Sequence, residues 1–195
     1  MSGGKAAKGK GRLVLYLGGI RSGKSALAQE RVAAFTRRGG AVAYLATWPE
    51  PPRGKADPER ERRVRLHRQS RPAGWTTLEA WRGLVEALKA VSKGAPGRGA
   101  GAFRAILLDG TGLFVSNAMA WPENRVLDQA EVFCLSCRHQ AALTVVVADE
   151  VGQGGVPGHP VARRFADLNG KFNQALARAA DEVWWVAAGT AFRTK

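Results

Sequence analysis

An eight-residue stretch near the N-terminus, Gly18-Gly-Ile-Arg-Ser-Gly-Lys-Ser25, most limits how this chain can fold. Its glycines let the backbone turn tightly, so that successive N–H groups point into one small space. The apolar run Leu13–Leu17 before it predicts a buried parallel strand. Apolar residues at helical spacing follow it from Ser25 to Arg38, and Gly39-Gly40 ends this predicted helix. A glycine-rich turn between a strand and a helix predicts a phosphate-binding loop.

The residue types in this loop indicate how it would hold a nucleotide. The candidate phosphate-binding positions are Gly18, Gly19, Ile20, Arg21, Ser22, Gly23, Lys24 and Ser25. The Lys24 ammonium is expected to reach the β- and γ-phosphates of a nucleoside triphosphate, and the Ser25 hydroxyl to bind Mg²⁺. The alternative is a glycine turn that binds nothing, but the strand before and the helix after the motif favour the nucleotide site. The motif predicts nucleotide binding and leaves the reaction open.

Apolar strands and helices alternate along the rest of the chain. The further predicted strands are Ala41–Ala46, Trp75–Glu79, Ala105–Asp109, Thr144–Ala148 and Val183–Ala187, and the predicted helices include Leu84–Val91, Leu127–Leu143 and a long helix containing Val161–Leu176. This alternation predicts an α/β fold, a mostly parallel sheet with helices on both faces that Val183–Ala187 closes. We expect one catalytic domain over residues 13–195, preceded by a disordered basic tail over residues 1–12.

A P-loop enzyme also needs a carboxylate at the end of a nearby strand, where it helps to hold the metal ion. Asp109 follows the apolar segment Ile106–Leu108 and has this form. Asp149 and Glu150, after a later strand, are competing candidates. A strand-end carboxylate that only faces solvent is the simpler alternative. The predicted metal ligands are Ser25 and Asp109.

The chain carries 30 lysines and arginines against 16 acidic residues, a formal net charge of +14. Such a chain could bind nucleic acid, an anionic membrane or a polyphosphate substrate. Eight of the cations lie between Arg53 and Arg71, in a segment without the interleaved aromatic residues of a nucleic-acid site. No apolar run is long enough to cross a bilayer and no signal peptide is evident, so we expect a cytoplasmic protein without a nucleic-acid partner.

The basic segment carries one histidine. If Asp57 caps a helix, then Arg60, Arg63, His67 and Arg71 fall on one stripe of it. Guanidinium groups around an imidazole disfavour its protonated form, and a neutral ring could attack the α-phosphate of a nucleotide. A solvated basic helix with an incidental histidine is the interpretation that the residues alone favour.

The two cysteines, Cys134 and Cys137, have the C-x-x-C spacing. Half of a zinc site or a redox pair would show this spacing, but a second pair of ligands is missing and the surrounding segment is predicted to be helical. We therefore expect two small thiols that face the core.

The order and spacing of these motifs resemble the bifunctional adenosylcobinamide kinase / adenosylcobinamide-phosphate guanylyltransferase family of cobalamin biosynthesis. The resemblance extends from about Leu13 to the C-terminus. Its segments are Gly18–Ser25, Tyr44–Thr47, Asp57–Glu59, Arg71–Trp75, Glu150–Pro157, Arg164–Asp167 and Ala180–Val183. This chain has Asp149 where the family commonly has asparagine.

The resemblance implies a RecA-like P-loop domain that carries out two reactions. ATP or GTP would phosphorylate the aminopropanol hydroxyl of adenosylcobinamide, with Mg²⁺ as cofactor. GMP would then pass from GTP to the new phosphate through a guanylyl-histidine, with release of pyrophosphate. The implied partners are nucleotides and a corrinoid, and the implied assembly is a homotrimer with sites between subunits.

The resemblance also implies which residues act. The nucleotidylated histidine of the family falls on His67, which favours the functional interpretation of that residue, and Lys24 would be catalytic with it. The further nucleotide contacts that it implies are Thr47, Trp48, Pro49, Arg68, Gln69, Ser70, Arg71, Glu79 and Asp109. The competing hypotheses are a RecA-like motor or other nucleic-acid-binding ATPase, suggested by the charge, and a small-molecule kinase without guanylyltransferase activity.

Overall fold

The computed structural model describes residues 11–48, 71–94 and 103–195, with four isolated positions between them, Pro58, Arg62, Arg65 and Gln69. In this part of the chain seven strands form one sheet, in the order β3-β2-β4-β5-β1-β6-β7. The strands are β1 (Arg12–Gly18), β2 (Ala41–Ala46), β3 (Thr76–Glu79), β4 (Phe103–Asp109), β5 (Leu143–Asp149), β6 (Glu182–Ala187) and β7 (Thr190–Arg193). Neighbouring strands are parallel except β6 and β7, which form an antiparallel hairpin at one edge.

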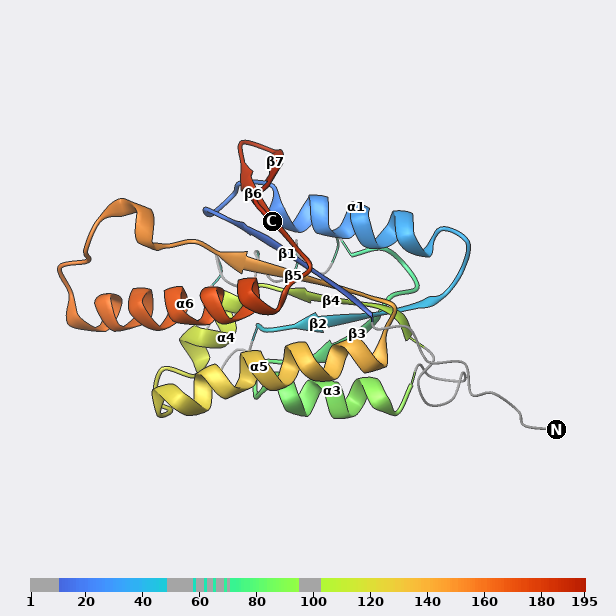
Figure 1. Cartoon of the computed structure of the whole chain (residues 1–195), viewed down its shortest axis with the longest axis horizontal. Helices are drawn as coiled ribbons and strands as arrows, with labels where there is room; N and C mark the ends of the chain where they lie inside the picture. Colours follow the sequence, from blue (N-terminus) through green and yellow to red (C-terminus); the bar gives the residue numbers. More distant parts are fainter. Residues whose placement is uncertain are drawn as a thin grey trace.

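Helices cover both faces of the sheet (Figure 1). They are α1 (Lys24–Thr36), α3 (Leu84–Ser92), α4 (Thr111–Asn117), α5 (Glu123–Gln140) and α6 (Pro160–Ala179), with a short 3-10 turn at Gly152–Gly154. Helix α1 packs on one face, and α3, α4, α5 and α6 pack on the other. The predicted α/β fold, a mostly parallel sheet with helices on both faces, is confirmed.

The central strands are apolar along their whole length because both of their faces are buried. Val145 and Val147 of β5 point into the core under α1, whereas Val146 and Ala148 point into the core under the other helices. This alternation is the period of two that any strand imposes on its side chains. It also fixes the direction of the residue that ends each strand, because that residue lies on the same face as the residue two positions earlier.

Several boundaries differ from the predictions. The sheet does not close at Val183–Ala187, because β7 adds an antiparallel edge strand beyond it. This strand is hard to recognise in the sequence, since it has only four residues and most of them are exposed. Residues 11 and 12 of the predicted tail belong to the fold, because Arg12 begins β1 and the Gly11 N–H donates to the carbonyl of Arg138. The predicted helix Leu127–Leu143 begins earlier, at Glu123, and ends before Leu143, which begins β5.

Two other predictions concern the basic segment and the membrane. Pro58, Arg62, Arg65 and Gln69 are helical and exposed, in the region where Asp57 was expected to cap a helix. Arg60, Arg63 and His67 lie outside the described residues. Among the helices that the structure describes, none combines the length and apolar character needed to cross a bilayer.

Candidate nucleotide-binding site

The candidate site lies where β1, β4 and β5 end. Because β5 lies between the other two strands, the edge of the sheet presents Gly18, Asp149 and Asp109 in that order. Asp109 is two residues after Leu107, and Asp149 is two residues after Val147; both of these apolar residues face α1. Strand alternation therefore directs the two carboxylates to the face on which α1 begins.

The phosphate loop connects β1 to α1, and two of its glycines are required by their surroundings. A Cβ at Gly18 would lie 2.2 Å from the carbonyl oxygen of Val186 in the neighbouring strand β6, so no other residue fits there. Gly23 caps α1 with φ 99°, in the left-handed region that favours glycine. The carbonyl of Ser22 accepts a hydrogen bond of 2.8 Å from the N–H of Gly189, in the turn between β6 and β7. The C-terminal hairpin thus supports the loop.

The Lys24 side chain is buried and lies within its own loop. Its Nζ donates a 2.7 Å hydrogen bond to the carbonyl of Gly19 and lies 3.0 Å from Oδ1 of Asp149. The Asp149 side chain is 30% exposed, so solvent reaches the pair from the carboxylate side. The structure therefore joins the lysine of the loop to one of the two strand-end acids.

Two asparagines fix the strand end that carries Asp149. The Nδ2 groups of Asn169 and Asn173 donate hydrogen bonds of 2.8 and 3.0 Å to the Asp149 carbonyl. Both asparagines are buried on α6, one turn apart, beside the apolar Leu168 and Phe172. They link α6 to the edge of the sheet on which the candidate site lies.

The other acid is joined to Ser25. The Ser25 hydroxyl donates to Oδ1 of Asp109 at 2.8 Å, and the Tyr44 hydroxyl donates to Oδ2 at 2.5 Å. Asp109 is 8% exposed, so both of its oxygens are used within the protein. Burial raises the pKa of Tyr44, and the adjacent carboxylate of Asp109 raises it further, so the phenol remains a hydrogen-bond donor.

The donor atoms at Ser25 and Asp109 suit Mg²⁺, which prefers hydroxyl, carboxylate and phosphate oxygens. In the described ranges, no group of three or more histidine, cysteine, aspartate or glutamate side chains could hold a metal ion. A magnesium ion here would therefore take its remaining ligands from nucleotide phosphates and water, as it commonly does in proteins that bind nucleoside triphosphates. Cys134 and Cys137, which were expected to face the core, are buried and unbridged.

The remaining predicted contacts are distributed along the same edge of the sheet. The buried Thr47 uses its hydroxyl to donate to the carbonyls of Asp109 and Gly110. Trp48 is partly buried next to it, and Glu79 is exposed at the end of the edge strand β3, in register with Ala46.

Six other predicted positions belong to the basic segment or precede it, and of these Arg71 is half-buried. Gln69 is exposed and helical. Pro49, His67, Arg68 and Ser70 lie outside the described residues.

Within the loop itself, Ile20 and Arg21 are exposed, whereas Ser22 is buried. Glu150, a competing metal candidate, turns its Oε1 to the N–H of Gly152 at 2.6 Å and so caps its own loop. Asp149, the other competitor, faces Lys24. The contact between Ser25 and Asp109 agrees in geometry with the predicted metal site, whose role stays a prediction.

Several residues of the site were not identified from the sequence. In the sequence, Tyr44 stands only within a segment of the family resemblance, although a tyrosine in an otherwise aliphatic strand is itself a signal, because its hydroxyl requires a partner when buried. Asn169 and Asn173 carry a comparable signal, since two amides one turn apart interrupt the apolar stripe of α6. The contact of Gly189 with the loop had no signal in the sequence.

Comparison with known proteins identifies the family. A family model described as cobinamide kinase / cobinamide phosphate guanyltransferase matches residues 14–194. The bifunctional adenosylcobalamin biosynthesis protein CobU of Salmonella typhimurium is 34% identical, over 94% of this chain and 99% of its own length. CobU of Escherichia coli is 32% identical over the same shares. The corresponding CobP of Pseudomonas aeruginosa is 35% identical, over 90% of this chain and 92% of its own length.

A solved structure supports the fold. The crystal structure of the RadB recombinase matches with a TM-score of 0.51 at 16% sequence identity, covering 91% of this chain and 74% of that chain. At this identity the likeness concerns the fold alone, and it confirms the predicted RecA-like P-loop architecture. Because the family match spans nearly the whole sequence, this chain belongs to the cobinamide kinase / cobinamide phosphate guanyltransferase family, whose members are transferases.

Proposed function

We propose that this protein phosphorylates the hydroxyl of adenosylcobinamide and then transfers GMP from GTP to the resulting phosphate. Besides family membership, the observation that carries the proposal is the pairing at the carboxyl edge of the sheet. There Lys24 meets Asp149, and Ser25 meets Asp109. A cation and a hydroxyl at the start of α1, next to strand-end carboxylates, suit the triphosphate and Mg²⁺ of ATP or GTP.

In the first reaction the protein would mainly bind and orient its substrates. The N–H groups of the loop and the N-terminal end of α1 would hold the phosphates. The Lys24 ammonium would move from the Asp149 carboxylate to the β- and γ-phosphates. Bound to Ser25 and Asp109, Mg²⁺ would neutralise negative charge on the phosphate oxygens. The hydroxyl oxygen of adenosylcobinamide would attack the γ-phosphorus and give up its proton to solvent, while the bond to the β-phosphate oxygen breaks and the nucleoside diphosphate leaves.

In the second reaction we assign the nucleophile to His67, on the resemblance alone. An imidazole nitrogen attacks the α-phosphorus of GTP and pyrophosphate leaves. A phosphate oxygen of adenosylcobinamide phosphate then attacks the same phosphorus and displaces the histidine, giving adenosylcobinamide-GDP. The proposed GTP contacts outside the loop are Thr47, Trp48, Pro49, Arg68, Gln69, Ser70, Arg71, Glu79 and Asp109.

Three further properties of the protein belong to the same proposal. Residues from about 11 onward would form one catalytic domain, the active assembly would be a homotrimer, and the enzyme would work in the cytoplasm, where its nucleotide substrates are. The trimer rests on the resemblance, and the cytoplasmic location on the nucleotide substrates that both reactions use.

The test is to incubate the purified protein with adenosylcobinamide, Mg²⁺ and either ATP or α-labelled GTP. We expect mass spectrometry to detect adenosylcobinamide phosphate first and adenosylcobinamide-GDP later. A labelled protein band that is acid-labile and alkali-stable would identify a phosphoramidate on histidine. Nucleotide hydrolysis without any modified corrinoid would contradict the proposal, and phosphorylation alone would restrict it to the kinase.

A further inference from the structure

Tyr44 is a buried polar residue that the proposed function leaves without a role. It lies in the middle of β2, is 2% exposed, and faces the core under α1, with Val42 and Ala46 on the same side. Its hydroxyl is 2.5 Å from Oδ2 of Asp109 on the neighbouring strand β4. The register pairs Tyr44 with Leu107, two residues before Asp109, so the phenol extends along the sheet towards the candidate site.

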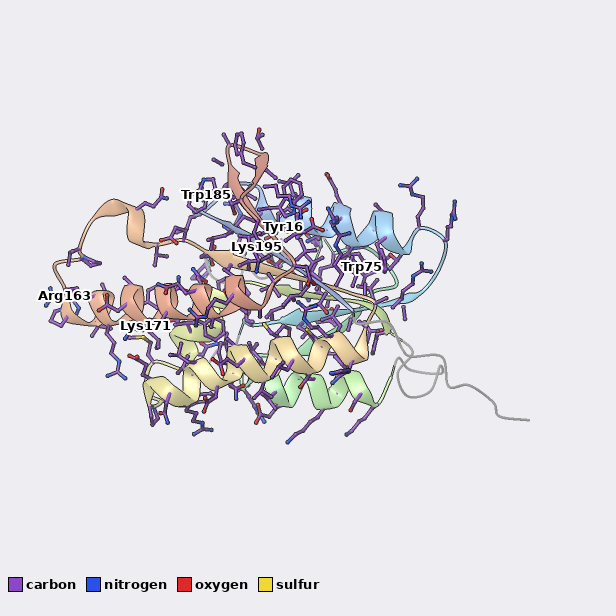
Figure 2. All side chains as sticks on the ribbon, in the orientation of Figure 1. Tyr16, Trp75, Arg163, Lys171, Trp185 and Lys195 are labelled. Atoms are coloured by element: carbon purple, nitrogen blue, oxygen red, sulfur yellow. The ribbon has the colours of Figure 1, made fainter. Side chains whose placement is uncertain are left out.

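The ring of Tyr44 is held by contacts on its aromatic surface. The guanidinium carbon of Arg71 lies 4.2 Å from the ring centroid, in a cation–π contact. The ring of Trp75 lies 6.5 Å away and is tilted by 40°. Trp75 lies on the side of the sheet that α1 covers (Figure 2). These contacts fix the ring, and Arg71 also interacts with the hydroxyl, where it opposes the rise in the Tyr44 pKa that burial and Asp109 cause.

The carboxylate of Asp109 depends on this hydroxyl. Its two oxygens each accept one side-chain hydrogen bond, Oδ1 from Ser25 and Oδ2 from Tyr44. Among the residues that the structure describes, no lysine or arginine forms an ion pair with Asp109. If Ser25 turns its oxygen to a metal ion, the Tyr44 hydroxyl is the side-chain donor to Asp109 that remains among the described residues.

We propose that Tyr44 is a positioning residue of the metal–nucleotide site, because its bond to Oδ2 keeps Oδ1 of Asp109 directed towards Ser25. It acts through Asp109 and does not itself contact the nucleotide. The proposal rests on the proposed function, since it takes Ser25 and Asp109 as the residues that bind the divalent cation. Removing the hydroxyl should weaken the use of Mg²⁺ and leave the binding of the nucleotide alone unchanged.

The test compares Tyr44→Phe with Tyr16→Phe, a matched control. Tyr16, labelled in Figure 2, is the other tyrosine of the chain and is also buried under α1. Its ring is stacked on that of Trp184, with the centroids 6.3 Å apart. For each variant, calorimetry gives the Kd of ATP in Mg²⁺ and in EDTA, and kinase assays give the half-saturating Mg²⁺ concentration. In Tyr44→Phe this concentration should rise on the order of tenfold, the effect of losing one hydrogen bond to a charged group. The Kd in EDTA, and all values for Tyr16→Phe, should change by less than about twofold.

Two results would overturn the proposal. Unchanged Mg²⁺ dependence in Tyr44→Phe would show that Asp109 needs no such support. An equal loss of affinity with and without Mg²⁺, together with a lower melting temperature, would show a purely structural role. The variant Asp109→Asn tests the metal site separately from Tyr44. If it alters the Mg²⁺ dependence and Tyr44→Phe does not, the role of Asp109 stands and only the role assigned to Tyr44 is wrong. If the unaltered protein binds ATP equally well in Mg²⁺ and EDTA, the metal site itself is wrong.

Discussion

The ammonium group of Lys24 and the carboxylate of Asp149 lie 3.0 Å apart at the carboxyl end of the sheet. On the proposed function, a triphosphate that enters the loop would have to take Lys24 from this carboxylate. The carboxylate would then face the phosphates without its cation. On that proposal, Asp149 opposes the binding of a nucleotide that carries no metal ion.

Replacing Asp149 with asparagine should strengthen nucleotide binding. Asparagine preserves the shape of the side chain and removes both the competing charge and its repulsion of the phosphates. We expect the Kd of ATP in EDTA, measured by calorimetry, to fall about fivefold, the effect of roughly 1 kcal/mol. Asp128→Asn makes the same change in net charge on the exposed side of α5 and should leave the Kd unchanged. Weaker binding by Asp149→Asn would indicate that the carboxylate assists the nucleotide.

Replacing His67 with alanine should separate the two reactions. Phosphoryl transfer needs the loop, Mg²⁺ and correct positioning, whereas covalent guanylyl transfer needs an imidazole nitrogen. The variant should form adenosylcobinamide phosphate and lose both the labelled protein intermediate and adenosylcobinamide-GDP. His139→Ala, at an exposed position near the end of α5, is the control and should retain both activities. Continued formation of adenosylcobinamide-GDP by the His67 variant would contradict the covalent assignment.

Replacing Glu182 with alanine should destabilise the fold. Glu182 is 2% exposed and accepts hydrogen bonds from Arg31 at 3.0 and 3.2 Å and from Trp184 at 2.9 Å, and it also pairs with Arg12. Its removal leaves cations without their partner, which costs about 3 kcal/mol of unfolding free energy. Urea denaturation followed by circular dichroism measures this change.

The exposed pair of Glu123 and Lys171 provides the comparison for Glu182. Their side chains are 53% and 49% exposed and lie 2.7 Å apart. Glu123→Ala should cost less than about 1 kcal/mol, because solvent screens exposed ion pairs. Equal effects of the two substitutions would show that burial does not strengthen the network around Glu182.

The two thiols should be inert in the folded protein. Burial raises the pKa of Cys134 to about 12 and that of Cys137 to about 11, from 9.0 for an unperturbed thiol. Both are therefore protonated at pH 8, and a thiol reagent should react with them only after urea has unfolded the chain.

The raised pKa values of the two thiols also make the free energy of unfolding depend on pH. Above pH 9 the unfolded chain loses thiol protons that the folded protein retains, so these groups make the free energy of unfolding fall as pH rises towards 11. Below pH 9 their contribution is constant. Fast labelling of the native protein at pH 8 would contradict the buried, protonated state of the thiols.

Much of the fold could be predicted because local patterns determine it. The apolar run before Gly18 and the glycines after it specify a strand, a turn and a helix within about 25 residues, and Asp109 stands directly after an apolar strand. The parallel sheet then follows from alternation, since helices between strands return the chain to the same edge. These features depend on residues that are close in sequence.

The contacts that complete the site could not be predicted, because they depend on strand order. Asp149 and Asp109 look alike in sequence, and only the position of β5 next to β1 directs Asp149 to Lys24. The hydrogen bond from Tyr44 to Asp109 likewise requires β2 beside β4. Edge strand β7 escaped prediction because its pattern is weak. The contact of the preceding turn with Ser22 escaped it because it is made by the backbone N–H of Gly189.

The position of β1 has a consequence for how the protein forms on the ribosome. β1 and the phosphate loop are synthesised early, but both neighbours of β1 are made much later, β5 at residues 143–149 and β6 at residues 182–187. Until β6 has left the exit tunnel, the emerging loop lacks the strand against which Gly18 packs. Such distant pairings slow folding and leave an apolar strand unprotected in the growing chain. On the proposed function, the loop of a nascent chain could therefore bind nucleotide only after β6 has been made.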